Sequence, residues 1–148
     1  MENLPQFLAY ANAFEKTLKD DDWTRLEPFF ASDAIYQVHG SFGCRLVGTQ
    51  AIFRGMKKSL DGFDRKFDSR NIEVTDGPSI EGDTVRLGWA VTYHKQGLQP
   101  YVLRGRSEVR YRDGKIVSLI DSYEDEAVAQ SFVEWQAANG IELDPRYV

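Results

Sequence analysis

The alternation of apolar and polar residues divides the chain into a helical first part and a second part made of strands. Residues 5–22 place apolar side chains at helical spacing, with a proline in the first turn. Residues 22–30 continue this spacing around an internal proline, which predicts a short or kinked second helix. A third helix is expected over residues 49–63, with Thr49 as its N-cap.

The first strand and its connections are defined less sharply. Residues 33–39 predict a strand, and the glycine-rich segment 40–48 is expected to be a connecting loop. Residues 64–77 predict a second strand, which should end at an Asp76-Gly77-Pro78 turn.

The alternation is clearest in the last three strands. We expect strands over residues 84–94, 101–112 and 115–123, with a tight Asp113-Gly114 hairpin turn between the last two. Residues on one face share an apolar character and should point inward: Val85, Leu87, Trp89, Val91 and Tyr93, then Tyr101, Leu103, Gly105, Ser107, Val109 and Tyr111. The other face of residues 101–112 carries Arg104, Arg106, Glu108, Arg110 and Arg112.

The final strand raises a question about one carboxylate. Alternation places Asp121 on the same face as Val117, Leu119 and Tyr123. Burial of an ionised carboxylate is costly unless a partner compensates it. A bulge at Gly105 would turn the neighbouring arginines inward as partners, but the regular alternation favours an outward position for Arg104 and Arg106.

A helix over residues 124–139, ending at Gly140, completes the pattern. Three helices, a twisted antiparallel sheet and a closing helix predict an α+β fold in a single domain, residues 1–148. The apolar side of the sheet must be covered by the helices, and a curved sheet around them leaves a concave space.

Composition excludes several classes of protein. A net charge of −5 and a pI near 5.0 argue against binding to nucleic acid. The single cysteine, Cys44, allows no internal disulfide and suggests a reducing, cytoplasmic location. The first residues lack the basic region of a secretory signal, and no apolar run is long enough to cross a membrane. The two histidines, His39 and His94, lie too far apart to predict a metal site.

Four segments in this order give the chain a family resemblance: FLAYANAFEKTLKDDDW, LEPFFASDAIYQVHG, VGTQAIFRGM and RYRDGKIVSLIDSYED. Over residues 5–126 the chain resembles the nuclear transport factor 2-like superfamily, within it the SnoaL-like group of polyketide cyclase and ketosteroid isomerase-like proteins. The resemblance implies a cone-shaped, curved antiparallel sheet wrapped around N-terminal helices, a cystatin-like roll. It also implies a homodimer packed through the outer sheet face. Members include isomerases, cyclases, dehydratases, epoxide hydrolases and ligand binders without catalysis, so the fold alone does not give the function.

The resemblance also implies roles for two residues. Asp121 lies where cyclases and related members keep a cavity carboxylate for acid/base chemistry, and Tyr36 matches a cavity tyrosine on the first strand. The chain departs from the epoxide hydrolases. Their Arg-x-Asp is replaced by the segment 88–90, Gly-Trp-Ala, and their water-holding asparagine is replaced by Val38.

We therefore expect a cofactor-independent enzyme that transfers a proton on a small hydrophobic carbonyl compound. Asp121 would be the base, with Tyr36, Tyr93 or Tyr123 as hydrogen-bond donor. His39 is a further candidate acid or base, because a bend at its strand end could bring it to the cavity mouth; the alternative is a surface histidine bonded to backbone. Side chains expected to line the cavity are Trp89, Tyr93, Tyr123, Phe14, Phe53, Phe67 and Leu119. The alternatives are a non-catalytic ligand-binding or accessory protein, in which Asp121 is only structural, and an interaction module.

Overall fold

The computed structural model describes residues 3–148 and has the α+β architecture that the sequence predicts. The helices are α1 (Asn3–Asp20), α2 (Thr49–Gly62) and α3 (Val128–Asn139), with short 3₁₀ helices η1 (Trp23–Phe29) and η2 (Asp64–Lys66). The strands are β1 (Phe30–His39), β2 (Cys44–Val47), β3 (Ser69–Glu81), β4 (Thr84–His94), β5 (Tyr101–Arg112) and β6 (Lys115–Tyr123). No helix in this part of the chain combines the length and apolar character that a membrane crossing needs.

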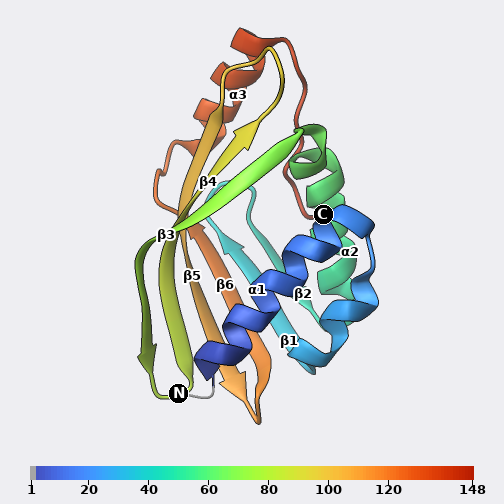
Figure 1. The fold of residues 1–148 in the computed structure, drawn as a ribbon, viewed down its shortest axis with the longest axis vertical. Coiled ribbons are helices and arrows are strands. Elements are labelled where there is room, and N and C mark those ends of the chain that lie inside the picture. The colour runs from blue at the N-terminus through green and yellow to red at the C-terminus, as the bar shows by residue number, and fades with distance from the viewer. Residues whose placement is uncertain (1–2) are drawn as a thin grey trace.

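The six strands form one curved, open sheet in the order β2-β1-β6-β5-β4-β3 (Figure 1). All neighbours are antiparallel except β1 and β6, which run parallel and join the first strand to the last. This parallel pairing was not predicted. It is important for the site because it places Val38 beside Asp121 and Tyr36 beside Leu119, residues far apart in sequence.

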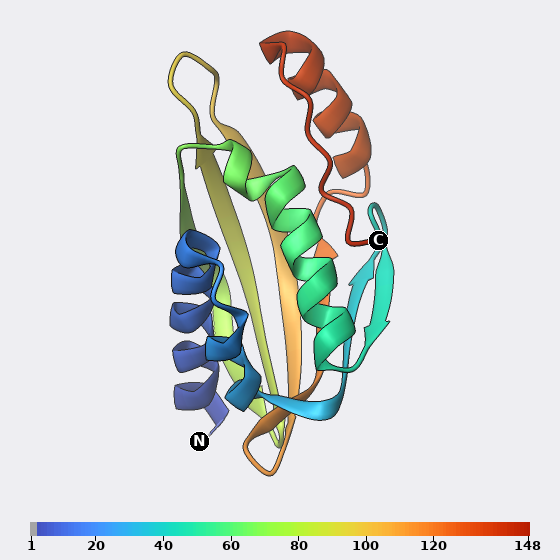
Figure 2. The same ribbon diagram turned by 90° about the vertical axis from the view of Figure 1, so that its right-hand side faces the viewer.

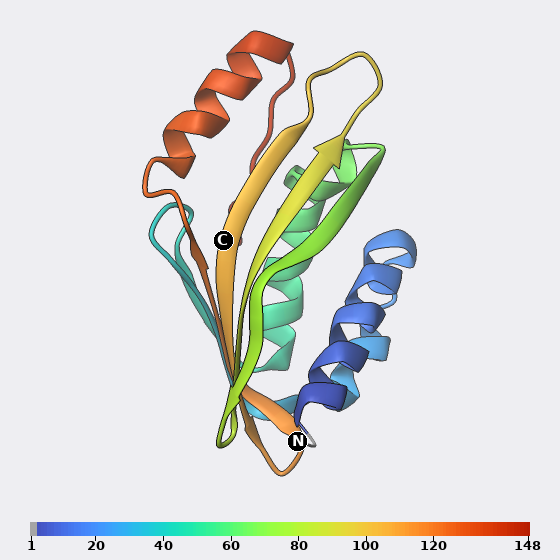
Figure 3. The same cartoon turned by 60° about the vertical axis from the view of Figure 1, so that its left-hand side comes forward.

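Helices α1 and α2 lie against the same face of the sheet, and α3 packs at one end (Figures 2 and 3). The buried side chains form two clusters. One joins α1, α2 and the middle of the sheet, and it includes Phe7, Ile52 and Val109. The other joins α3, through Phe132 and Trp135, to the end of β4 and the start of β5. The cavity described below lies between the helices and the sheet.

Several predicted bounds were wrong: β1 begins at Phe30 and not at residue 33, and α3 begins at Val128 and not at residue 124. The expected loop 40–48 contains β2, which pairs with β1 from Val38↔Cys44 to Ile35↔Val47. The expected turn at residues 76–78 does not end a strand, because β3 continues to Glu81 with shifts in register between Val74 and Ser79. The irregularity that resembled a turn is absorbed as a bulge in an edge strand, where interrupted pairing is tolerated.

The connections follow from local chemistry. The proline inside η1 cannot donate a backbone hydrogen bond, and this segment is a single stretch of 3₁₀ helix. Thr49 does not cap α2: the N-cap is Gly48, at φ 88°, and no side chain caps the helix. The Asp113-Gly114 hairpin is confirmed, with φ 53° and 76°, both in the left-handed region that such turns require.

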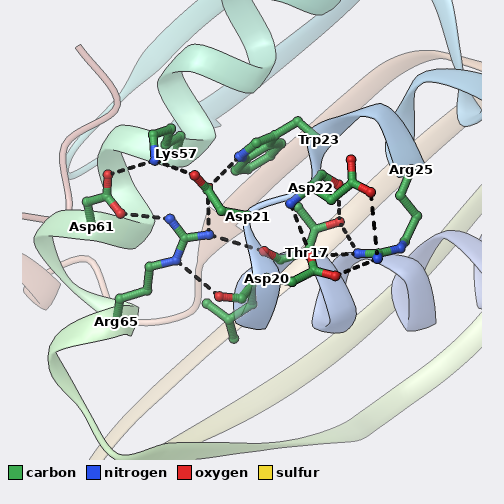
Figure 4. A network of polar contacts seen from close by, with 10 residues as sticks. Thr17, Asp20, Asp21, Asp22, Trp23, Arg25, Lys57, Asp61 and Arg65 are labelled. Atoms are coloured by element: carbon green, nitrogen blue, oxygen red, sulfur yellow. Dashed lines mark hydrogen bonds and ion pairs between the residues drawn. The ribbon is translucent and has the colours of Figure 1, made fainter.

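An ion-pair network fixes the end of α1 to α2 (Figure 4). Asp21 accepts from Lys57 at 2.7 Å and pairs with Arg65 at 2.9 Å, and both cations also contact Asp61. These bonds lower the pKa of Asp21 to about 2, with Lys57 as the largest cause. The network therefore holds together the two helices that cover the cavity.

Candidate functional site

The concave face of the sheet and the helices enclose a cavity of about 450 Å³. Its walls are mostly apolar and aromatic, with contributions from α1, α2, the strands β1 and β3 to β6, and the segment after α3. It opens between α1 and the edge strand β3, where Leu8, Ile72 and Val74 are about half exposed. This size and lining are typical of a pocket for a small organic ligand.

Asp121 lies on the cavity wall at the centre of a hydrogen-bond network. Its Oδ2 accepts from the Tyr36 hydroxyl at 2.7 Å, and its Oδ1 accepts from Ser107 Oγ at 2.6 Å. Trp89 Nε1 in turn donates to Ser107 Oγ at 2.9 Å. Sheet register explains the arrangement, because Ser107 stands directly opposite Asp121 on β5. The carboxylate is therefore oriented by rigid strands and keeps further lone pairs for a ligand.

No lysine, arginine or histidine in residues 3–148 forms an ion pair with Asp121. Burial raises the pKa of Asp121, and the hydrogen bonds from Ser107 and Tyr36 oppose the rise only in part. A carboxyl group with a raised pKa can accept and return protons near neutral pH. Asp121 therefore combines two features that suit a general base: no ion-pair partner among residues 3–148, and a tyrosine hydroxyl within hydrogen-bond distance.

Besides Tyr36, Tyr123 and Tyr147 line the cavity near the carboxylate. The hydroxyl oxygens of Tyr36 and Tyr147 are 3.3 Å apart, and their rings meet edge to face at 5.4 Å between centroids. Burial raises the pKa of Tyr36, Tyr123 and Tyr147, with the charge of Asp121 adding to the rise. These hydroxyls therefore stay protonated and can act as hydrogen-bond donors in the cavity.

A second polar group lines the same cavity. Arg70 pairs with Asp64 at 2.7 Å and with Glu15 through two nitrogens, and Tyr93 donates to Asp64 at 3.0 Å. The Arg70 guanidinium lies 5.8 Å from the centre of the Phe14 ring. This cation is held by two carboxylates, and it ties β3 to α1 at the edge of the cavity opening.

The structure brings most of the predicted site residues together. The predicted residues on the cavity wall are Tyr36, Asp121, Tyr123, Trp89, Tyr93, Phe14 and Leu119. Arg104 and Arg106 point outward, as the alternation predicted, and are exposed. Among residues 3–148 no group of His, Cys, Asp or Glu is arranged to hold a metal ion.

Two predicted aromatic residues do not line the cavity. Phe53 lies behind it, packed against Trp23 and Phe30 at 5.6 and 5.5 Å between ring centres. Phe67 packs on Phe63 in the cluster under α3. Helical or strand spacing identifies an inward face, but it does not distinguish core contacts from cavity contacts.

His39 is also outside the cavity. It is exposed, and in the strand register it stands opposite Ser122. Val38 and Asp121 stand opposite each other one residue earlier, so their side chains lie on the other face of the sheet. The strand does not bend enough at its end to reverse this facing. His39 is therefore not a candidate catalytic residue of this cavity.

Sequence reasoning missed two residues of the site. Ser107 was assigned to the inward face but not to the site. Its place opposite Asp121 across the hairpin, on the same face of the sheet, was the signal that could have identified it. Tyr147 gave no signal, because it lies beyond every predicted element and reaches the cavity only through tertiary packing.

Comparisons with known proteins agree with this architecture. The family model for the SnoaL-like domain matches residues 9–119. Among solved structures, TerC crystallised with polyporic acid is 16% identical, with a TM-score of 0.67 and coverage of 90% of this chain and 99% of that chain. An NTF2-like protein of unknown function from Exiguobacterium sp. 255-15 is 20% identical, with a TM-score of 0.63 and coverage of 81% and 98%.

An LEH-like epoxide hydrolase from M. tuberculosis is 14% identical, with a TM-score of 0.60 and coverage of 90% of this chain and 94% of that chain. At these identities the likeness shows the fold alone. A search of curated proteins gives no significant match. Asp121 and Tyr147 lie beyond the segment that the family model matches, so their roles depend on the geometry described above.

Proposed function

Because the chain belongs to the SnoaL-like domain family, we propose that it is a cofactor-independent enzyme that moves a proton on a small hydrophobic carbonyl compound. The observation that supports this proposal best is Asp121, a cavity carboxylate with a raised pKa, two hydrogen-bond donors and no cation partner in residues 3–148. Such a group has the properties of a general base for carbon acids.

The proposed reaction begins when ionised Asp121 removes a proton from the carbon next to the carbonyl. The electrons of the C–H bond form an enolate, whose oxygen accepts a hydrogen bond from a cavity tyrosine. Tyr123 suits this role, because it lines the cavity and its hydroxyl has no hydrogen-bond partner among residues 3–148. Return of the proton from Asp121 to another carbon completes an isomerisation. In a cyclisation, the enolate carbon attacks a second carbonyl, and the alkoxide oxygen that forms takes the proton back from Asp121.

The charges on the cavity wall support an uncharged substrate. Arg70 is already paired with Asp64 and Glu15, so it is not free to receive an anionic group. Asp121 would repel an anion directly. The apolar walls favour a ligand with few polar atoms, and a cavity of about 450 Å³ suits a compound of two or three fused rings.

A non-catalytic binding protein is the alternative, because an apolar cavity can hold a ligand without chemistry. Hydrogen–deuterium exchange distinguishes the two functions. Cyclic ketones that raise the melting temperature are incubated with the protein in D₂O, and deuterium at the carbon next to the carbonyl is followed by NMR. A base at Asp121 should accelerate this exchange.

The substitution Asp121→Asn should reduce exchange by roughly 10²–10⁴-fold while ligand affinity changes little. Asp113→Asn is the matched control, because it removes an exposed carboxylate in a hairpin turn that tolerates asparagine. Equal exchange in wild type and Asp121→Asn, with binding retained, would support the non-catalytic alternative.

A further inference from the structure

The segment after α3, residues 141–148, returns along α2 (Figures 1 and 2), and its Pro145 and Tyr147 line the cavity. We name it the returning segment. Its backbone is tied to α2 at two points: Asp144 N donates to Gly62 O at 2.9 Å, and Ser59 Oγ donates to Pro145 O at 2.7 Å. The segment is therefore a wall of the cavity with a defined position.

The surface of α2 is adapted to this contact. A Cβ at Gly62 would lie 2.0 Å from Asp144 O, and a Cβ at Gly55 would lie 3.1 Å from Tyr147 O. Glycine at both positions lets the returning segment lie directly against the helix backbone. This close approach brings the Tyr147 ring against Tyr36 and its hydroxyl to the cavity.

The hydroxyls of Tyr147 and Tyr36 and the carboxylate of Asp121 form a chain of 3.3 and 2.7 Å contacts. Each hydroxyl has a single hydrogen to donate. When Asp121 is ionised, Tyr36 must donate to the carboxylate, and the hydrogen of the 3.3 Å contact must come from Tyr147. When Asp121 carries a proton on Oδ2, that proton can be donated to Tyr36, and Tyr36 can turn its own hydrogen toward Tyr147.

We propose that Tyr147, Tyr36 and Asp121 form a relay whose hydrogen bonds reverse when the carboxylate takes up a proton. After reversal the hydrogen of Tyr147 is no longer used by Tyr36 and can be donated to a ligand oxygen in the cavity. The catalytic meaning of this relay rests on the proposed function, because a donor is then released while the enolate oxygen gains its charge. Only one proton changes its atom, from substrate carbon to Asp121, and each tyrosine keeps its own hydrogen.

The surroundings of Asp121 make the relay measurable without a substrate. The titratable groups that interact with Asp121 are Tyr10, Tyr36, Tyr123, Tyr147 and Cys44. Burial raises the pKa of each of these hydroxyls and of the thiol, and no cation in residues 3–148 pairs with the carboxylate. Asp64 lines the same cavity, burial raises its pKa as well, and its charge acts on Tyr123 and Tyr147, so its carboxyl signal is followed in the same titration.

The test follows the side-chain carboxyl ¹³C signal of Asp121 during pH titration. Tyr147→Phe removes the hydroxyl but keeps the ring that packs on Tyr36. It should raise the pKa of Asp121 by roughly 0.3–0.5, because a donor that strengthens the Tyr36 bond to the ionised form is lost. Tyr36→Phe should raise it further. Tyr111→Phe is the matched control, since Tyr111 is a buried tyrosine whose hydroxyl has no partner.

The double variant Tyr36→Phe/Tyr147→Phe isolates the relay from simple packing. If Tyr147 acts through Tyr36, the double variant should titrate like Tyr36→Phe alone. An unchanged pKa in Tyr147→Phe, or a full additional effect of Tyr147→Phe in the Tyr36→Phe background, would overturn the relay. Because the titration needs no turnover, it can support the relay even if the proposed reaction is wrong, and it can contradict the relay even if the reaction is right.

Discussion

At the scale of the residue, Asp121 holds its charge at a cost to stability. Its environment of strand side chains and aromatic rings disfavours the ionised form, and only hydroxyl donors offset that penalty. The native protein therefore binds a proton at Asp121 more tightly than the unfolded chain does. This is the behaviour expected of a group kept for its reactivity.

The sign of the pH dependence follows from this raised pKa. The favourable contribution of Asp121 is complete below the ordinary carboxyl value of 3.8 and is lost as pH rises through the pKa of the folded state. We expect Asp121→Asn, which cannot ionise, to be more stable than wild type at pH 7 by about 1 kcal/mol. The gain should disappear near pH 3.5. Thermal unfolding of both proteins between pH 3.5 and 8 measures the difference, and a lower stability of the variant at pH 7 would contradict it.

At the scale of the element, α2 has two functions, because one side of it covers the cavity and another holds the returning segment. Alanine normally stabilises a helix relative to glycine. Gly62 should be an exception, since an added Cβ would meet Asp144 O at 2.0 Å.

We predict that Gly62→Ala destabilises the full chain by roughly 1–3 kcal/mol, because the returning segment must move away from α2. The control is the same substitution in a chain shortened after Leu143, which lacks the clashing backbone. There Gly62→Ala should be neutral or slightly stabilising. Urea unfolding of the four proteins gives the comparison, and an equal loss in both backgrounds would assign the effect to α2 itself.

The sequence predicted the elements whose patterns are long and regular. The alternation in β4, β5 and β6 gave the correct facing of Trp89, Arg106 and Asp121, because one buried face fixes the strand register. It missed β2, whose four residues follow a glycine-rich stretch and are too few to show a period. It also missed the contribution of Tyr147, because that side chain has an irregular backbone and its position depends on contacts with α2.

At the scale of the whole molecule, the outer face of the sheet carries more positive charge than it neutralises. Arg106 pairs with Asp76 at 2.7 Å and Arg112 with Asp33 at 2.9 Å. Arg104 and Arg110 are exposed and have no ion partner among residues 3–148. We propose that two copies pack through this face, with these two arginines meeting carboxylates of the partner.

Sedimentation analysis should then give twice the 16.9 kDa mass of the chain. Arg104→Glu combined with Arg110→Glu should give monomers at unchanged secondary structure, because like charges would face each other across the two-fold axis. Lys19→Glu on the exposed end of α1 is the control and should remain dimeric. A wild-type protein that is monomeric at tens of micromolar would exclude this arrangement.

The parallel pairing of β1 with β6 has a consequence for how the protein is made. While a ribosome synthesises the chain, β1 and β2 emerge early, but β6, the second partner of β1, is made only from residue 115 onward. Until then one edge of β1 has no strand beside it, and α1 and α2 have little sheet on which to dock. The nascent first half should therefore depend on a chaperone or on rapid elongation, and folding of the cavity should begin only when β6 leaves the exit tunnel.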